Sequence, residues 1–223
     1  MIRECALSDI SDGKIYNLND MVKADTAGCQ GCFKCCTGMG TSIILDPYDI
    51  HILKRKLNCS FQDLISKCYI ELNVFEGVIL PNLSMGENDC CVFLIDGRCS
   101  IHDSRPGLCR IFPLGRVYKS EDESFNYFLQ TNECVKSSRA KIKVKKWIAT
   151  QDTENNQSFI GKWHFFVRGV TEKIYNLHSS GRGEMVNDIA MYILNEFYVA
   201  DFDSDDIYNN IINKIENAKK QLC

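Results

Sequence analysis

The chain has 223 residues, of which 45% are hydrophobic and 25% charged, a balance that excludes wholesale disorder and predicts a single domain over 1–223. Its net charge of −3 gives no electrostatic reason to expect nucleic acid or an anionic membrane surface as a partner. No apolar run approaches a membrane span, and residues 1–14 lack the apolar core of a secretory signal, so we expect a cytoplasmic location.

The first cysteine group follows a polar, weakly patterned segment at 1–24. Cys29, Cys32, Cys35 and Cys36 lie close together in a loop that glycines punctuate. Glycine lets the backbone come close, so its amides can point at thiolate sulfurs. The chain has 13 cysteines, and in a reducing compartment such clusters are more often metal-binding or catalytic than disulfide-bonded.

The next segment predicts one strand and two helices. Residues 41–45 are a short strand candidate, and Asp46, directly before a proline, predicts the cap of a helix. Ser60 predicts the cap of a second helix, whose apolar face we expect to continue to Leu72. Cys68 falls on that face, so we interpret it as a core residue rather than a ligand.

The second cysteine group lies among short strands. An Asp-Gly pair predicts a hairpin turn within 92–101, and two prolines bound a compact loop at 104–113. Two further strands are expected at 115–119 and 125–130, around an acidic turn. The members of this group are Cys90, Cys91, Cys99, Cys109 and Cys134.

Beyond the second group the composition changes. A basic run at 136–146 is interpreted as a solvated face, and 151–157 as a polar loop. Apolar residues then recur at helical spacing over 159–177, 189–197 and 203–222, which predicts three helices.

These elements predict an α+β, helix-rich fold. Small antiparallel strands would surround the cysteine loops in a metal-binding half at 25–135. A helical bundle would follow in the other half, at 140–223.

The cysteine spacing fits a metal or cluster held by thiolates. Cys29, Cys32 and Cys35 are each two residues apart, as are consecutive ligands of a ferredoxin-type loop, and a fourth ligand must come from elsewhere in the chain. The chain has two pairs of adjacent cysteines, Cys35-Cys36 and Cys90-Cys91, which we call doublets. Because adjacent side chains diverge, we do not expect either doublet to bind one small ion with both thiols. Eight thiolates would fill two tetrahedral sites, or one cluster and one single-ion site. The candidates are Cys29, Cys32, Cys35, Cys36, Cys91, Cys99, Cys109 and Cys134.

Arginines near the second group fit an anionic site. Arg105 and Arg110 flank Cys109, where they could offset thiolate charge or bind an anionic cofactor or substrate. His102 lies close to Cys99, and a supporting role is favoured over direct ligation. No phosphate-binding loop or zinc-protease motif occurs, so any catalysis would depend on the metal centre.

The combined pattern resembles the YkgJ family of cysteine-cluster proteins over about residues 27–135. The matching residues are the first cysteine group, Cys91-Val-Phe-Leu, Gly97-Arg-Cys99-Ser-Ile, Arg105-Pro106, Cys109-Arg110 and Phe112-Pro113. The family's proposed role is to chelate zinc or iron, and the resemblance implies that the eight candidate cysteines hold a metal or an iron–sulfur cluster. Cys90 directly before Cys91 departs from the family pattern and leaves open which of the two is the ligand.

A relative of this domain occurs in flagellin lysine N-methylases, which are associated with a [4Fe–4S] cluster and S-adenosylmethionine. The resemblance thus implies a [4Fe–4S] cluster, with S-adenosylmethionine as a further candidate cofactor. We favour an iron–sulfur protein with a redox or methyltransferase-type role on a protein or peptide. The alternatives are a zinc-binding structural or interaction module without catalysis, and redox sensing by free thiols.

Overall fold

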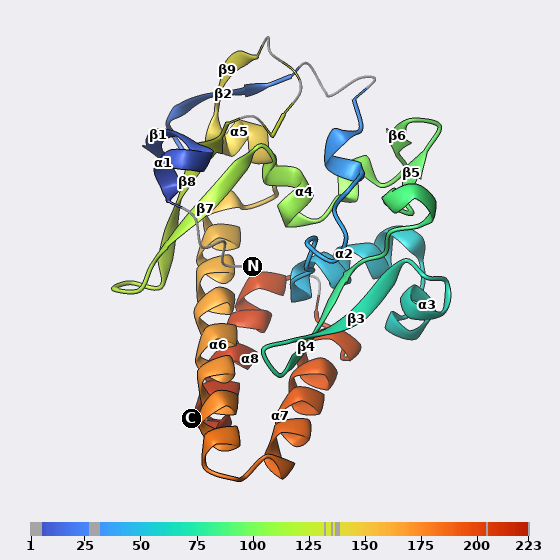
Figure 1. Ribbon diagram of the computed structural model, residues 1–223, viewed down its shortest axis with the longest axis vertical. Coiled ribbons are helices and arrows are strands. Elements are labelled where there is room, and N and C mark those ends of the chain that lie inside the picture. The colour runs from blue at the N-terminus through green and yellow to red at the C-terminus, as the bar shows by residue number, and fades with distance from the viewer. Residues whose placement is uncertain are drawn as a thin grey trace.

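The computed structural model combines helices with short antiparallel strands, which confirms the helix-rich α+β class (Figure 1). Every strand pair among the described residues is antiparallel. Within the same residues, no helix is both long and apolar enough to cross a membrane. The structure describes residues 6–26, 32–131, 133–134, 136, 139–203 and 205–222.

The elements follow the chain in this order. The helices are α1 Leu7–Ile10, α2 Pro47–Leu57, α3 Phe61–Ser66, α4 Gly107–Ile111, α5 Val144–Ile148, α6 Thr153–Ser179, α7 Glu184–Leu194 and α8 Ile207–Leu222. The strands are β1 Ser11–Tyr16, β2 Met21–Asp25, β3 Ile70–Phe75, β4 Val78–Leu83, β5 Leu94–Ile95, β6 Arg98–Cys99, β7 Leu114–Lys119, β8 Ser124–Gln130 and β9 Ala140–Lys143. Short 3₁₀ turns lie at Lys34–Cys36, Glu87–Asp89 and His102–Ser104, and a π-helical turn at Asn195–Val199.

Helices α2 and α3 begin where their predicted caps lie. The side chains of Asp46 and Ser60 accept a hydrogen bond from the backbone N–H three residues further on. The carboxylates of Asp49 and Asp63 accept from the N–H of the cap in return. These reciprocal bonds satisfy backbone donors that a helix start leaves free, and both predicted starts are confirmed.

The second of these helices is shorter than expected. Helix α3 ends at Ser66, and Cys68 has a left-handed φ of 54°, which turns the chain towards β3. Cys68 is exposed, so its assignment to the core is wrong, and Leu72 lies opposite Pro81 in the β3–β4 hairpin. The partner strand lies downstream, and its pairing overrides the local helical pattern.

The sequence patterns did not predict β1, β2 and β9. These strands form at the two borders of the cysteine-bearing part of the chain, residues 25–135. Ser11 lies opposite Gln130 in the β1–β8 pair, and Met21 lies opposite Lys143 in the β2–β9 pair. The weakly patterned segment 1–24 therefore contributes to two sheets, and the basic run contains β9 and α5. Both pairings join residues far apart in the chain, so no local pattern signals them.

Three segments have a different type of secondary structure from the one that the sequence predicts. Residues 41–45 run beside β4, but only Ile44 forms an isolated bridge, to Asn82. The loop expected at 104–113 contains α4. Helix α6 begins inside the expected polar loop because Asp152 caps it by accepting from the N–H of Asn155.

The two predicted strand pairs of the second cysteine group are confirmed. In the β5–β6 hairpin, Asp96 and Gly97 have left-handed φ values of 50° and 71°, as the expected tight turn requires. Strands β7 and β8 pair over their whole length and join at an acidic turn that contains Glu123.

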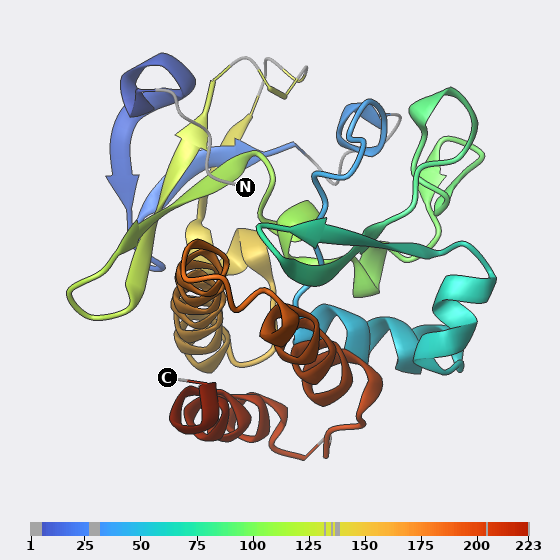
Figure 2. The ribbon, with the colours of Figure 1, turned by 60° about the horizontal axis from the view of Figure 1, so that its bottom comes forward.

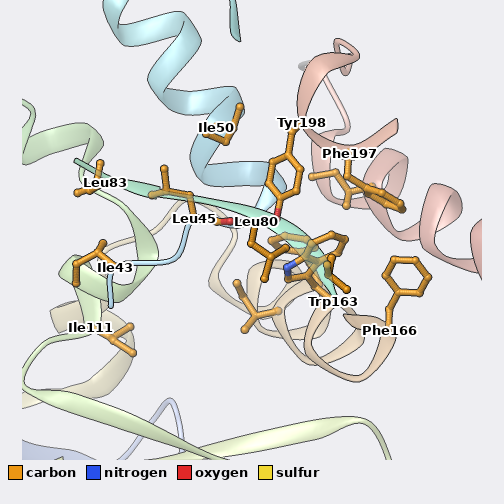
Figure 3. Packing of buried hydrophobic residues seen from close by; sticks show 14 of the residues in the cluster. Ile43, Leu45, Ile50, Leu80, Leu83, Ile111, Trp163, Phe166, Phe197 and Tyr198 are labelled. Atoms are coloured by element: carbon orange, nitrogen blue, oxygen red, sulfur yellow. Dashed lines mark hydrogen bonds between the residues drawn. The ribbon is translucent and has the colours of Figure 1, made fainter. Parts of the chain in front are cut away.

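The three predicted C-terminal helices are confirmed as α6, α7 and α8, which lie on one side of the molecule with the strands on the other (Figure 2). Helix α7 continues into the π-helical turn, which buries Phe197 and Tyr198 against Trp163 of α6 (Figure 3). The Tyr198 hydroxyl donates to the carbonyl of Leu45 at 3.1 Å. One apolar cluster thus contains residues from the cysteine-bearing part and from the helices.

Candidate metal centre

Six cysteines line one cavity of about 300 Å³, which we call the thiol cavity. It lies where the first cysteine loop, the β5–β6 hairpin and α4 come together (Figure 1). The structure therefore brings six of the eight candidate ligands to one place. They are Cys32, Cys35, Cys36, Cys91, Cys99 and Cys109.

Backbone hydrogen bonds join the two cysteine groups directly. The N–H of Cys91 donates to the carbonyl of Cys36 at 2.7 Å, and the N–H of Gly38 donates to the carbonyl of Asp89 at 2.9 Å. Gly38 has a left-handed φ of 69°, which glycine adopts without a steric penalty. The first loop can therefore fold back and hold its thiols beside Cys91.

Two short elements present the remaining thiols. Cys99 lies at the end of β6, just after the hairpin turn. Cys109 lies in α4, whose first residue, Gly107, donates its N–H to Asp49 Oδ1 at 2.8 Å. Helix α2 thus fixes the start of the helix that carries Cys109.

The thiols resist ionisation because they are buried close together. Burial raises the pKa of Cys109, and the neighbouring Cys91 and Cys35 thiols add to the rise. Burial also raises the pKa of Cys91 and of Cys99. Several thiolates in one cavity are unfavourable unless a cation offsets their charge, and a bound metal ion would do so while releasing the protons. The donor set fits a thiolate-bound metal.

Cys35 is the exception to this trend. A hydrogen bond from the Cys36 thiol lowers the pKa of Cys35 to about 7, and the positive charge of Arg105 acts in the same direction. The same bond raises the pKa of Cys36, which loses it on ionisation. Cys35 therefore ionises more readily than Cys36, Cys91, Cys99 and Cys109 do.

The two cysteine doublets behave differently. Cys91 is 8% exposed and lines the cavity, whereas the Cys90 thiol points elsewhere and donates to the carbonyl of Asn88 at 3.7 Å. We expect adjacent side chains to diverge, and this doublet does so. The Cys35 and Cys36 thiols instead both reach the cavity, because they lie in a tight 3₁₀ turn and hydrogen-bond to each other.

Three predicted site residues are not placed in the thiol cavity. Cys29 lies outside the described residues, and the half-buried Cys134 does not line the cavity. Arg110 lines a second cavity instead. Within the described ranges, no three His, Cys, Asp or Glu side chains are arranged to hold a single metal ion. The six thiols surround a space rather than converge on one point.

Arg105 lines the thiol cavity, and its guanidinium contacts His102. Arg105 Nη1 lies 3.1 Å from His102 Nε2. Burial lowers the pKa of His102, and the nearby Arg105 lowers it further, so the ring is neutral and Nε2 can accept the bond. This geometry fits a histidine that orients Arg105 beside the thiols.

One positioning residue has no signal in the sequence. Asp49 belongs to the capping box of α2, yet its carboxylate also fixes the start of α4 through Gly107. That contact joins residues far apart in the chain, so only the fold reveals it.

A comparison with protein families matches residues 28–146, more than half of the chain, to the CxxCxxCC family, described as "Putative zinc- or iron-chelating domain". The chain belongs to this family. The match covers all six thiols of the cavity and supports metal binding through the clustered cysteines. No curated protein and no solved structure matches the chain.

Proposed function

We propose that the protein binds an iron–sulfur cluster of the [4Fe–4S] type in the thiol cavity. The observation that carries the proposal is a single cavity of about 300 Å³ with six thiols in its wall. Cys29 and Cys134 are proposed as further ligands. The ligands within the cavity would come from Cys32, Cys35, Cys36, Cys91, Cys99 and Cys109.

The size of the cavity favours a cluster over a single ion. A structural zinc ion is enclosed by four ligands at about 2.3 Å, which leaves no space between ion and sulfur. The thiol cavity has the volume of about ten water molecules in the liquid. A cluster of several iron and sulfide ions, held by four thiolates, suits such a space.

A bound cluster would supply electron transfer. Arg105 places a positive charge beside Cys35 and Cys99, where it favours their thiolates. His102 accepts a hydrogen bond from this guanidinium and so limits the orientations that Arg105 can take.

The surroundings of the cavity suit a protein or peptide substrate. Phe33 and Ile95 are 47% and 56% exposed. Phe33 adjoins Cys32, and Ile95 adjoins Leu94, both of which line the cavity. We propose that these two exposed apolar side chains belong to a surface that contacts the substrate. We propose a redox or methyltransferase-type enzyme, with S-adenosylmethionine as its second cofactor because a relative of the cysteine-cluster domain occurs in flagellin lysine N-methylases.

Zinc is the alternative metal. The family description names zinc beside iron, and four of the six thiols are enough for one closed tetrahedral site. In that case the protein is a structural or interaction module, and the metal contributes directly to its folding.

Cysteine substitutions test the location of the centre. Cys99→Ser and Cys109→Ser each remove a thiol of the cavity, whereas Cys68→Ser removes an exposed thiol outside it. Metal content is measured on each full-length variant purified without oxygen, with circular dichroism to confirm folding. We expect the two cavity variants to lose most of the metal and Cys68→Ser to retain it.

Cys90→Ser is the closest control, because Cys90 is adjacent to a proposed ligand but does not line the cavity. It should retain its metal. Full metal content in both Cys99→Ser and Cys109→Ser would overturn the proposed location.

A further inference from the structure

A second cavity, of about 240 Å³, lies beside the thiol cavity and has arginine and aspartate side chains in its wall. The two cavities share only Asp103 and Arg105, and α4 contributes to both, with Cys109 facing the thiols and Arg110 facing the second space. We call this second space the arginine cavity.

Two arginines of this cavity have no carboxylate partner within ion-pair distance. None of the ion pairs in the part of the chain that the structure describes involves Arg110 or Arg116. Arg110 Nη2 donates to the carbonyl of Asp103 at 2.8 Å, and the charge of Asp49 acts on this guanidinium from beyond ion-pair distance. The Nε of Arg116 is shielded from solvent and has no hydrogen-bond partner. A buried guanidinium whose hydrogen bonds are incomplete is unfavourable, so an anion that lies against its other nitrogens would stabilise the site.

Arg116 is held in place from outside the cavity. Its Cζ lies 5.2 Å from the centroid of the Phe125 ring, a cation–π contact that keeps the guanidinium oriented. An oriented guanidinium presents a planar fork that matches the oxygens of a carboxylate or a phosphate.

The cavity also contains two acids near the same point. A side chain on Gly107 would place its first carbon 3.7 Å from Arg116 Nη2, 3.7 Å from Asp49 Oδ1 and 3.9 Å from Asp46 Oδ2. The missing side chain therefore leaves an open spot on which one cation and two carboxyl groups converge. Burial raises the pKa of Asp49 to about 6 and that of Asp46 well above its usual range, so these acids offset the arginines only in part.

We propose that the arginine cavity binds a small organic anion. Its oxyanion group, a carboxylate or a phosphate, would lie against Arg110 and Arg116. A hydroxyl or ammonium group at its other end would donate to Asp46 or Asp49. The cavity has the volume of about eight water molecules in the liquid, which suits a small metabolite.

This site differs from the metal centre in its donor groups, which are guanidinium and carboxyl rather than thiol. The ligand would nevertheless lie beside the thiol cavity, because Arg105 borders both spaces. A small anion there would be placed as a substrate or effector of the metal centre.

Nuclear magnetic resonance titration of the full-length protein tests the proposal with three probes: glycolate, acetate and inorganic phosphate. Glycolate carries a carboxylate and a hydroxyl, whereas acetate lacks the donor group. We expect saturable shifts of amides around the arginine cavity, with glycolate binding at least tenfold more tightly than acetate. A stronger response to phosphate than to glycolate would identify the oxyanion as a phosphate.

Two variants locate the binding. Arg116→Gln removes the guanidinium, and Gly107→Ala fills the open spot with a methyl group at ordinary contact distances. Each should weaken binding at least tenfold, while Arg168→Gln, which removes an exposed arginine on α6, should leave it unchanged. If Arg116→Gln does not fold, the affinity of Gly107→Ala for the probes decides whether the ligand binds in the arginine cavity.

The proposal is overturned if none of the three probes gives saturable shifts at the arginine cavity, or if Gly107→Ala binds as tightly as the wild type. Metal content does not enter this readout, so failure here is distinguishable from failure of the proposed metal centre.

Discussion

Around the thiol cavity the chain runs in strands of two residues and turns of three, whereas α6 alone runs for 27 residues. The helices bury large aromatic side chains against one another, with Trp163, Phe197 and Tyr198 at the centre (Figure 3). The wall of the thiol cavity contains one comparable side chain among the described residues, Phe93, and its most conspicuous shared feature is the six thiols.

The two regions therefore depend on different forces. The helices gain their stability from apolar burial, which needs no ligand. The cysteine region gathers buried thiols whose ionisation is unfavourable without a cation, so its order should depend on the metal. Four experiments test this contrast.

Metal removal should affect the cysteine region alone. After treatment with a chelator, the amides of Gly38 and Cys91, which join the two cysteine groups, should lose at least tenfold of their protection from hydrogen exchange. Amides in the middle of α6 should keep theirs. Equal loss of protection in both regions would show that one cooperative unit, rather than two differently stabilised regions, responds to the metal.

Phe197→Ala should destabilise the helices by about 3–5 kcal/mol, because the ring is fully buried and packs on Trp163 and Phe166. Denaturant unfolding measures the change. Tyr175→Ala on α6 is the control, since that side chain is 73% exposed and should cost little. The folded fraction of Phe197→Ala should keep its metal, and a loss of metal in that fraction would contradict the contrast.

Two glycines on α6 should respond with opposite signs. A methyl group on Gly161 would overlap the carbonyl oxygen of Glu123 in the β7–β8 turn, so Gly161→Ala should cost about 1–3 kcal/mol. Nothing lies within 4 Å of the same position on Gly169, so Gly169→Ala should stabilise the helix by about 0.5–1 kcal/mol. Thermal unfolding of the pair measures both, and the same sign in both variants would argue against the close approach of α6 to this turn.

His164 should make stability depend on pH. Burial lowers its pKa to about 4, with the charge of Arg168 adding to the effect. The unfolded chain, with an ordinary histidine pKa near 6.5, then binds more protons between about pH 4 and 6.5, so stability falls as the pH drops through that window. Since the ring is partly exposed, we expect an effect of about 1 kcal/mol.

The His164→Phe variant keeps a ring that can stack on Tyr118, whose centroid lies 3.5 Å from that of His164, but cannot titrate. It should lose less stability than the wild type between pH 6.5 and 4. His178→Gln replaces an exposed histidine on the same helix and should follow the wild type. An identical pH profile for His164→Phe and the wild type would refute the assignment to His164.

The features that the sequence predicted are those encoded locally. Asp46 and Ser60, together with the residues that follow them, predicted the starts of α2 and α3. The Asp96-Gly97 pair predicted a hairpin turn, and the apolar spacing predicted α6, α7 and α8. Each signal lies within a few residues of the element that it specifies.

Features that depend on distant partners were missed. Strands β1 and β2 pair with β8 and β9 near the other end of the cysteine-bearing part, and the strand pairing of β3 replaced the expected extension of α3. At the site, the spacing of the cysteines identified the thiols, but only the bond between the Cys91 N–H and the Cys36 carbonyl explains how the two groups meet. At the arginine cavity, Arg105 and Arg110 were predicted to belong to an anionic site, but Asp49 and Gly107 had no signal, since they converge only in the folded chain.

The most direct test of the central claim is the metal and acid-labile sulfide content of the full chain purified without oxygen, together with its absorption spectrum. We predict about four iron and four sulfide ions per chain and a broad absorption band in the visible. Zinc in a whole-number ratio, with no sulfide and no colour, would contradict the iron–sulfur proposal and favour a structural zinc module.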